Sequence, residues 1–328
     1  SGDNTEIHTR ETLYARYKSA VVVNRSVYIG NVEYDGTVYG DMMIKTPPNK
    51  PDIYHIDNAV EISVRDGDSI IKLMEYADRI LQFKKNKLHI YNVAGEVEFL
   101  EDTYHHKGVD YPSAVCRTDF GVAWANTVGC YLYDGEKVHN LLERDGKPII
   151  KIEPQGWRSD FPGESAQTPY ITQVGFIPRF RQLLVQQNAK SNSTIRIFDF
   201  RTNSWVRHVG GHGVKLQEET NYITDWNNDL IFCHTACTGT FVKWDVDGAA
   251  TSQLSVITKQ FDFGFPGIKK KIYKVYITYR GDGSGVIVKY DINGELEYAG
   301  DVGGYFFNGI TSITDPTSNG AASATPLV

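Results

Sequence analysis

Short runs in which apolar and polar residues alternate recur along the chain, and such runs predict β-strands. The clearest is IYKVYITYR (272–280), which places aromatic and aliphatic residues on one face and Lys, Thr and Arg on the other. VIVKYD (286–291) follows a glycine-rich turn, and Asn293-Gly294 then precedes another alternating run. Asn-Gly between such runs favours a tight hairpin, because both residues tolerate positive φ. Residues 259–310 are therefore predicted to form an antiparallel, β-sandwich-like sheet domain. The sequence does not decide whether this domain is complete.

Upstream, a looser unit recurs in which an apolar strand ends in Asp or Asn and a turn follows. If the Asp or Asn at the end of each strand is used as a marker, successive markers lie 57, 42, 65 and 46 residues apart. A four-stranded propeller blade needs about 40–50 residues, so two steps fit and two require insertions. The pattern predicts an all-β fold with a β-propeller of uneven blades over residues 15–258, and a β-sandwich with long loops is the alternative. The markers are Asp35, Asn92, Asp134, Asp199 and Asp245.

Two stretches fit the repeat less clearly. Residues 68–84, DSIIKLMEYADRILQFK, are compatible with a short helix, but two strands joined at Ala77-Asp78 suit the surrounding pattern better. Residues 257–265, ITKQFDFGF, are interpreted as the join between the propeller and the last sheet.

Composition narrows the classes of protein without selecting one. Aromatic residues make up 12% of the 328 residues and there are 30 glycines, which favours strands and tight turns. The formal net charge of −6 excludes a generally basic nucleic-acid binder but permits a local basic patch. No apolar run is long enough for a membrane-spanning helix, so membrane insertion is not expected. Residues 1–14 are predicted to be a polar arm, and residues 311–328 a polar tail or linker.

The four cysteines, Cys116, Cys130, Cys233 and Cys237, are too few for a disulfide scaffold in a chain of this size. We expect reduced, largely buried thiols and synthesis in a cytoplasm. Cys233 and Cys237 lack the second ligand pair that a zinc ribbon or finger requires, and no metal is predicted there. His105-His106 is interpreted as a turn or strand end.

Other motifs of catalysis and cofactor binding are also missing. The sequence has no sialidase-type Asp box, P-loop or nucleophile elbow, and its short acidic turns are incomplete as calcium loops. Glycans could still be cleaved by a pair of carboxylates whose positions the sequence alone does not give. We therefore predict no catalytic residues, no cofactor and no enzymatic activity.

Several stretches resemble the propeller-type structural proteins of short-tailed bacteriophages. They are ARYKSAVVVNRSVYIGNVEYDG, GDMMIKTPPNKPDIY, GDSIIKLMEYADRILQFKKNKLHIYNV, TYHHKGVDYPSAVCRTDFGVAWANTVGCYLYDG and FDFGFPGIKKKIYKVYITYRG. The family comprises tail hub, nozzle and packaged-DNA stabilisation proteins, and the resemblance covers roughly residues 15–300. It implies a propeller, often followed by a β-sandwich, that assembles around the tail channel, and it implies no active site.

Two sets of residues are candidates for contact with partners. The basic cluster Lys269, Lys270, Lys271, Lys274 and Arg280 would suit DNA phosphates or an acidic neighbouring subunit, or it protects an edge strand from unwanted pairing. Trp157, Phe306 and Phe307 lie in stretches that would anchor a partner if exposed, or belong to the core if buried.

The sequence thus predicts a non-enzymatic structural protein of a phage virion, located in the tail hub or nozzle. Its expected partners are other tail, portal or adaptor subunits, copies of itself in a ring, and the DNA that passes through. One alternative is a receptor-binding tail propeller that binds or cleaves glycans. A second is a cellular propeller that binds other proteins, although the regular signatures of that class are missing.

Overall fold

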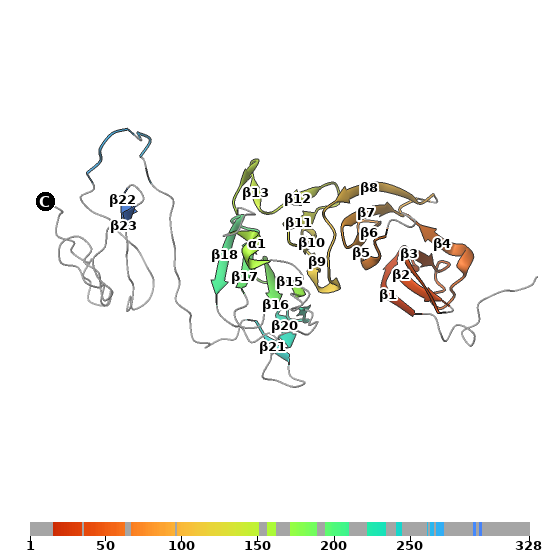
Figure 1. Cartoon of the computed structure of the whole chain (residues 1–328). Coiled ribbons are helices and arrows are strands. Elements are labelled where there is room, and N and C mark those ends of the chain that lie inside the picture. Colours follow the sequence, from red (N-terminus) through yellow and green to blue (C-terminus); the bar gives the residue numbers. More distant parts are fainter. Residues whose placement is uncertain are drawn as a thin grey trace, which may run out of the picture. The chain divides into compact units, whose positions relative to one another are not determined.

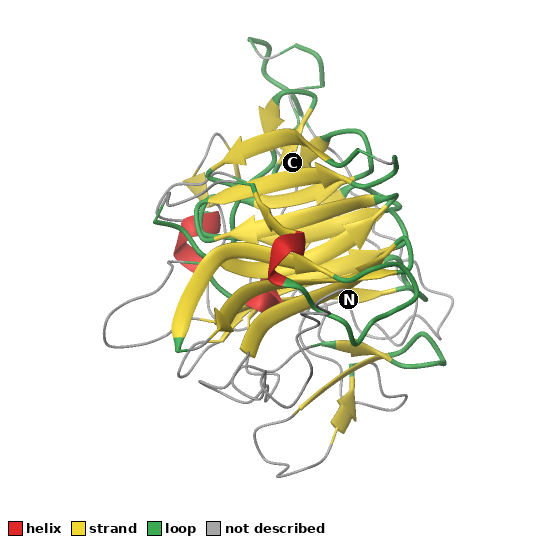
Figure 2. Ribbon diagram, turned by 90° about the vertical axis from the view of Figure 1, so that its right-hand side faces the viewer, coloured by secondary structure: helices red, strands yellow, loops and turns green. Residues whose placement is uncertain are grey.

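The structure is a computed structural model, and it describes part of the chain. The described residues are 16–34, 36–62, 67–95, 97–150, 156–161, 171–188, 194–209, 222–233, 241–244, 261, 263–265, 267–271, 291–292 and 295–296. The chain divides into two compact units, Ser1–Ala250 and Thr251–Val328. Figure 2 shows short helical turns beside many strands, so the predicted all-β class is confirmed.

The first unit is built from sheets that follow one another in chain order (Figure 1). The first sheet has the order β1-β2-β3-β4 and the second β5-β6-β7-β8, with all neighbours antiparallel. Their strands are β1 (Arg16–Val23), β2 (Ser26–Tyr34), β3 (Thr37–Lys45), β4 (Ala59–Glu61), β5 (Ile70–Tyr76), β6 (Arg79–Lys84), β7 (Lys87–Asn92) and β8 (Phe99–His105). The 3₁₀ turn η1 (Ile56–Asn58) precedes β4.

The third and fourth sheets repeat this arrangement, and a fifth has three described strands. The third sheet consists of β9 (Val115–Thr118), β10 (Gly121–Ala125), β11 (Cys130–Tyr133) and β12 (Val138–Asn140), after the 3₁₀ turn η2 (Pro112–Ala114). The fourth consists of β15 (Ile171–Ile177), β16 (Gln182–Asn188), β17 (Thr194–Asp199) and β18 (Ser204–Val209). The fifth consists of β19 (Ile223–Thr224), β20 (Leu230–Cys233) and β21 (Phe241–Lys243).

Consecutive four-stranded meanders are the building units of a β-propeller, and here each sheet packs against the next. Buried aliphatic and aromatic side chains join the first sheet to the second, the second to the third, the third to the fourth and the fourth to the fifth. Gly30 permits close approach at the first junction, since a Cβ there would lie 3.0 Å from Leu73 Cδ1. The fold is therefore propeller-like, as predicted.

The stretch 68–84 forms two strands rather than a helix. β5 and β6 pair antiparallel with Tyr76 opposite Arg79, so Ala77 and Asp78 are the two turn residues. Both have positive φ, 49° and 57°, as a type I′ turn requires. The preferred prediction for this stretch is confirmed.

The uneven repeat spacing has a structural explanation. Asn92, Asp134 and Asp199 mark the end of the third strand in their sheets, but the described strands around Asp35 are the second and third of the first sheet. The equivalent position there is Lys45, which lies 47 residues before Asn92 rather than 57. The choice of Asp35 as a marker was therefore wrong.

The other long step, 65 residues, contains an insertion between the third and fourth sheets. It includes the hairpin of β13 (Glu143–Arg144) and β14 (Lys147–Pro148) and the single-turn helix α1 (Trp157–Asp160).

The second unit is described at two places. One is residues 261–271 without 262 and 266, and the other is the pair β22 (Asp291–Ile292) and β23 (Glu295–Leu296). Ile292 pairs with Glu295, which leaves Asn293-Gly294 between them as the predicted hairpin requires. The runs 272–280 and 286–290, the arm 1–14 and the tail 311–328 lie outside the described residues.

Candidate interaction surfaces

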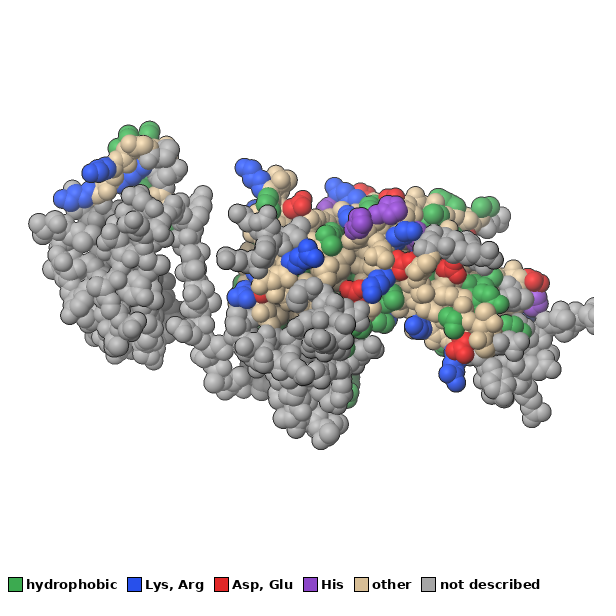
Figure 3. Space-filling model, viewed as in Figure 1, with side chains coloured by type: hydrophobic (Ala, Val, Ile, Leu, Met, Phe, Trp, Pro, Cys, Tyr) green, Lys and Arg blue, Asp and Glu red, His purple; other side chains and the backbone are tan. Residues whose placement is uncertain are grey.

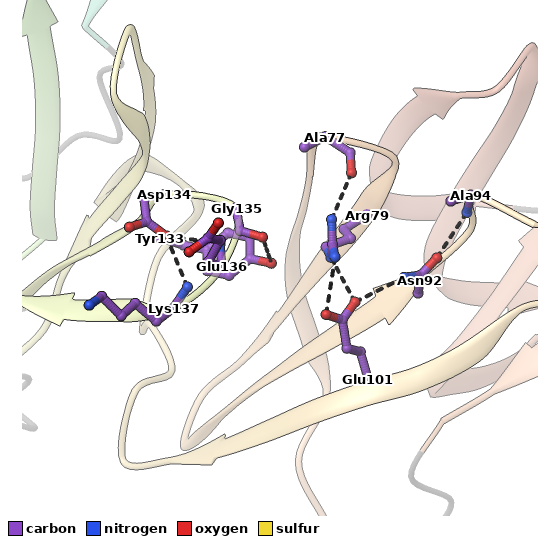
Figure 4. Close-up of polar contacts among 10 residues, drawn as sticks. All are labelled: Ala77, Arg79, Asn92, Ala94, Glu101, Tyr133, Asp134, Gly135, Glu136 and Lys137. Carbon is purple, nitrogen blue, oxygen red and sulfur yellow. Dashed lines mark hydrogen bonds and ion pairs between the residues drawn. The ribbon is translucent and has the colours of Figure 1, made fainter.

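Asn92, Asp134 and Asp199 cap the turns that follow the third strands of their sheets, and Figure 4 shows Asn92 and Asp134. Asn92 Oδ1 accepts the backbone N–H of Ala94 at 3.0 Å, and Asp134 Oδ1 accepts those of Glu136 and Lys137 at 2.9 Å each. Asp199 Oδ1 accepts the N–H of Arg201 at 2.8 Å in the same way. These side chains mimic a turn of backbone, so the repeated motif has a structural role.

Asp134 shows the electrostatic consequence of this capping. Burial acts to raise the pKa of its carboxyl group, but hydrogen bonds from the Lys137 amide, the His139 ring and the Glu136 amide lower that pKa to about 2. The His139 Nε2 lies 2.6 Å from Asp134 Oδ2. This carboxylate is committed to its own hairpin.

Beside this turn, a second polar network holds the edge of the second sheet. Arg79 on β6 donates from Nε to Glu101 Oε2 at 2.7 Å, and Asn92 donates to the same oxygen at 3.0 Å (Figure 4). The Arg79 hydrogen bond lowers the pKa of Glu101 against the opposing effect of burial. This network ties β6, β7 and β8 together at one end.

Charged side chains also reinforce the junctions between sheets. Glu98, before β8, accepts the Tyr28 hydroxyl at 2.6 Å and pairs with Lys45, both on the first sheet. Lys107 lies 5.1 Å from the ring centroids of Tyr104 and Tyr131, on the second and third sheets. Such contacts between cations and aromatic faces favour one packing of neighbouring sheets.

The insertion provides the reinforcement between the third and fourth sheets. Trp157 is fully buried, stacks on Phe161 and donates its Nε1–H to the Asn126 carbonyl at 2.8 Å. Asp160, also buried, accepts Arg196 Nε at 2.6 Å and Arg207 Nη2 at 2.8 Å. The prediction that Trp157 could anchor a partner was therefore wrong. Its neighbours in the sequence are mostly polar, but its ring fills the core between the third and fourth sheets.

The remaining candidate residues divide into two groups. Lys269, Lys270 and Lys271 are exposed in the second unit. Lys274, Arg280, Phe306 and Phe307 lie outside the described residues.

Exposed aromatic residues precede these lysines in the chain, and they were not among the predicted contact residues. Phe261, Phe263, Phe265 and Ile268 each expose 61% to 64% of their surface. Figure 3 shows Lys and apolar side chains together on this part of the second unit. We refer to the described residues of 261–271 as the aromatic–lysine loop. The spacing Phe-x-Phe-Gly-Phe-Pro-Gly was the available signal, because Gly and Pro interrupt a strand and leave its aromatic residues without a sheet.

The thiol and histidine candidates behave as structural groups where they are described. Cys116 and Cys130 are free cysteines, and burial raises the pKa of the Cys116 thiol to about 12. His105 ends β8 and His106 follows with φ 61°, which confirms the predicted strand end and turn. Among the described residues, no group of three or more His, Cys, Asp or Glu could hold a metal ion. Cys237 lies outside them.

In the described part of the chain, no helix is long and apolar enough to cross a bilayer.

Comparison with known proteins yields structural similarity alone. The sequence matches no protein-family model and no curated protein. The extracellular domain of a hybrid two-component system from B. thetaiotaomicron matches with TM-score 0.40 and 11% identity over 66% of this chain, and this chain covers 25% of that one.

A protein named as a 6-phosphogluconolactonase from Bacteroides fragilis matches with TM-score 0.41 and 11% identity, over 69% of this chain and 68% of that one. A nidogen/laminin complex matches with TM-score 0.32 and 9% identity, over 66% and 69%. Similarities this distant give no indication of activity.

Proposed function

We propose that this chain is a non-enzymatic structural protein of a tailed-phage virion, a component of the tail hub or nozzle. In this role, copies assemble with other tail, portal or adaptor subunits around the channel through which DNA leaves. The sequence resemblance to short-tailed phage proteins is the source of the proposal.

The observation that supports it is how unit Ser1–Ala250 uses its polar side chains. Glu98 and Lys107 each contact two neighbouring sheets and Asp160 joins helix α1 to the fourth sheet, while Asp134 and Asp199 cap the turns of their own sheets. Polar groups held in this way stiffen a scaffold, because a buried charge that loses its partner is costly. A part that must keep its shape while DNA passes benefits from such stiffness.

The test is the protein composition of phage particles. Particles of the phage that encodes this chain are purified on a density gradient, and their proteins are quantified by peptide mass spectrometry. We expect the chain in intact particles, in a fixed ratio to the portal protein, and its release by chaotrope together with tail proteins. If infected cells contain the chain but purified particles do not, the proposal is wrong.

A further inference from the structure

The aromatic–lysine loop exposes several large apolar side chains, which soluble proteins usually bury. Three phenylalanines and one isoleucine within eleven residues lie mostly in contact with water. Contiguous apolar surface of this kind marks contact sites on soluble proteins. Phe263 has φ 51°, which is unfavourable for a bulky residue, and Gly264 follows with φ 80°. The turn thus holds aromatic rings outward at a conformational cost, which is common at contact sites.

Charge indicates what would cover this loop. Three consecutive lysines follow the phenylalanines, and all three are exposed. Residues 1–250 contain 27 Lys and Arg against 33 Asp and Glu, whereas residues 251–328 contain seven of each. The whole acidic excess of the chain therefore lies in the first unit, so that another copy offers an acidic surface complementary to the lysines.

One strand of the first unit combines acidic charge with exposed apolar side chains. β8 is the last strand in the order of the second sheet, so one of its edges has no neighbour within that sheet. Val97, which precedes this strand, and Phe99 and Leu100 at its start are 77%, 52% and 43% exposed. Residues 97–102 contain three carboxylates, Glu98, Glu101 and Asp102, and no basic residue. Glu98 pairs with Lys45 and Glu101 with Arg79, whereas Asp102 is exposed and accepts the backbone N–H of Thr103.

We propose that the aromatic–lysine loop of one copy docks on the β8 edge of a second copy. The phenylalanines pack on Val97, Phe99 and Leu100, and Lys269–Lys271 lie against the exposed carboxylate of Asp102. Because the two surfaces differ, the contact is heterologous and builds a ring if the rotation closes. The inference rests on the proposed function, since it supplies the contact through which a tail component would surround a channel.

The test measures self-association of the full chain, residues 1–328, by sedimentation velocity at increasing concentration. Three charge-reversal proteins are compared with the unchanged chain. One carries K269E, K270E and K271E, one carries D102K, and one carries all four substitutions. A matched control carries K18E, K50E and K147E, which replace three other exposed lysines.

We expect the unchanged chain to associate. The loop triple variant and D102K should each weaken association by about tenfold or more, and the combined protein should recover a substantial part of the loss. The control should associate like the unchanged chain. A further variant, F261S with F265S, should weaken association without any charge change, which separates the apolar contribution from the lysines.

Several results would overturn the inference. One is a monomer at all concentrations, which would also result if the loop docked on its own chain. A second is association that none of the loop or β8 variants changes. A third is binding of a 30-base-pair DNA duplex through the same lysines in place of a second copy. None of these results changes the outcome of the particle-composition test. The docking contact can therefore be disproved without disproving the proposed function, and the reverse also holds.

Discussion

Two regions of this molecule are rich in charged and aromatic side chains, and they use them in opposite ways. In residues 16–244, Trp157 is fully buried and Asp160 accepts hydrogen bonds from two arginines of the fourth sheet. In residues 261–271, Phe265 is 64% exposed and three lysines lie at the surface. The difference teaches that residue type alone does not identify a contact site. A side chain buried within the fold stabilises the scaffold, whereas an exposed one can contact a partner.

The largest effect should come from removing the buried indole. Trp157→Ala deletes a ring that fills the junction of two sheets and leaves the Asn126 carbonyl without its donor, so we expect a loss of about 3–5 kcal/mol in the free energy of unfolding. Urea denaturation monitored by circular dichroism measures it. Trp226, which is 91% exposed, is the matched control, and Trp226→Ala should change stability by less than about 0.5 kcal/mol. Equal losses for the two would contradict the comparison.

The next effect concerns the buried carboxylate. Asp160→Ala leaves the guanidinium groups of Arg196 and Arg207 without their counter-charge, and we expect a loss of about 3 kcal/mol. The measurement is again the urea midpoint. Asp145, a 92% exposed carboxylate near Arg144, provides the control, because such surface pairs contribute about 0–1 kcal/mol. A loss below that of Asp145→Ala would show that Asp160 does not fix helix α1 to the fourth sheet.

A smaller, pH-dependent effect should arise at the capped turn of the third sheet. The pKa of Asp134 falls from 3.8 to about 2 on folding, so its ionised form stabilises the folded state. This stabilisation is fully present above pH 3.8. It is lost as the pH falls towards 2, because the carboxylate then becomes protonated in the folded protein as well.

Asp134→Asn keeps an acceptor for the turn, as Asn92 does in the second sheet, but cannot titrate. We expect its urea midpoint to depend less on pH between 4 and 2 than that of the unchanged chain. Asp134→Ala should cost about 1 kcal/mol at pH 7, through two lost backbone hydrogen bonds. If Asp134→Asn and the unchanged chain lose stability in parallel on acidification, the capping interpretation is wrong.

The smallest effect on stability is expected in the aromatic–lysine loop. Phe265→Ser removes a ring that is mostly in water, so the thermal midpoint should change by less than about 1–2 °C. Differential scanning calorimetry at low protein concentration, where copies are separated, is the suitable measurement. A loss comparable to that of Trp157→Ala would place Phe265 in the core and remove the basis for a docking loop.

Much of the fold followed from local sequence. The hairpin at Ala77-Asp78 was predictable because alternation on both sides leaves two residues suited to a tight turn. The markers Asn92, Asp134 and Asp199 were recognisable because an Asp or Asn that caps a turn must stand directly at the end of its strand. The described strands on either side of Asp35 are the second and third of their sheet, so only strand order distinguishes this marker from the others.

The contact residues were harder to predict because burial depends on distant partners. Trp157 lies among polar residues in sequence, and its ring is covered by Phe161, Trp205 and the backbone of Asn126. Conversely, Phe261 and Phe263 have an alternating pattern typical of a buried strand, yet they are exposed. Alternation shows which residues share a face, but not whether another sheet covers that face.

The most direct test of the central claim is zero-length cross-linking between copies. Unlabelled and ¹⁵N-labelled chains are mixed, treated with a carbodiimide that joins lysine amines to carboxylates with loss of water, and analysed by peptide mass spectrometry. The account predicts mixed-isotope links between the peptide of Lys269–Lys271 and the peptide of residues 96–102. Two results would contradict this prediction. In one, the lysines and residues 96–102 are linked only within chains of a single isotope, and in the other the lysines are linked only to other parts of the chain.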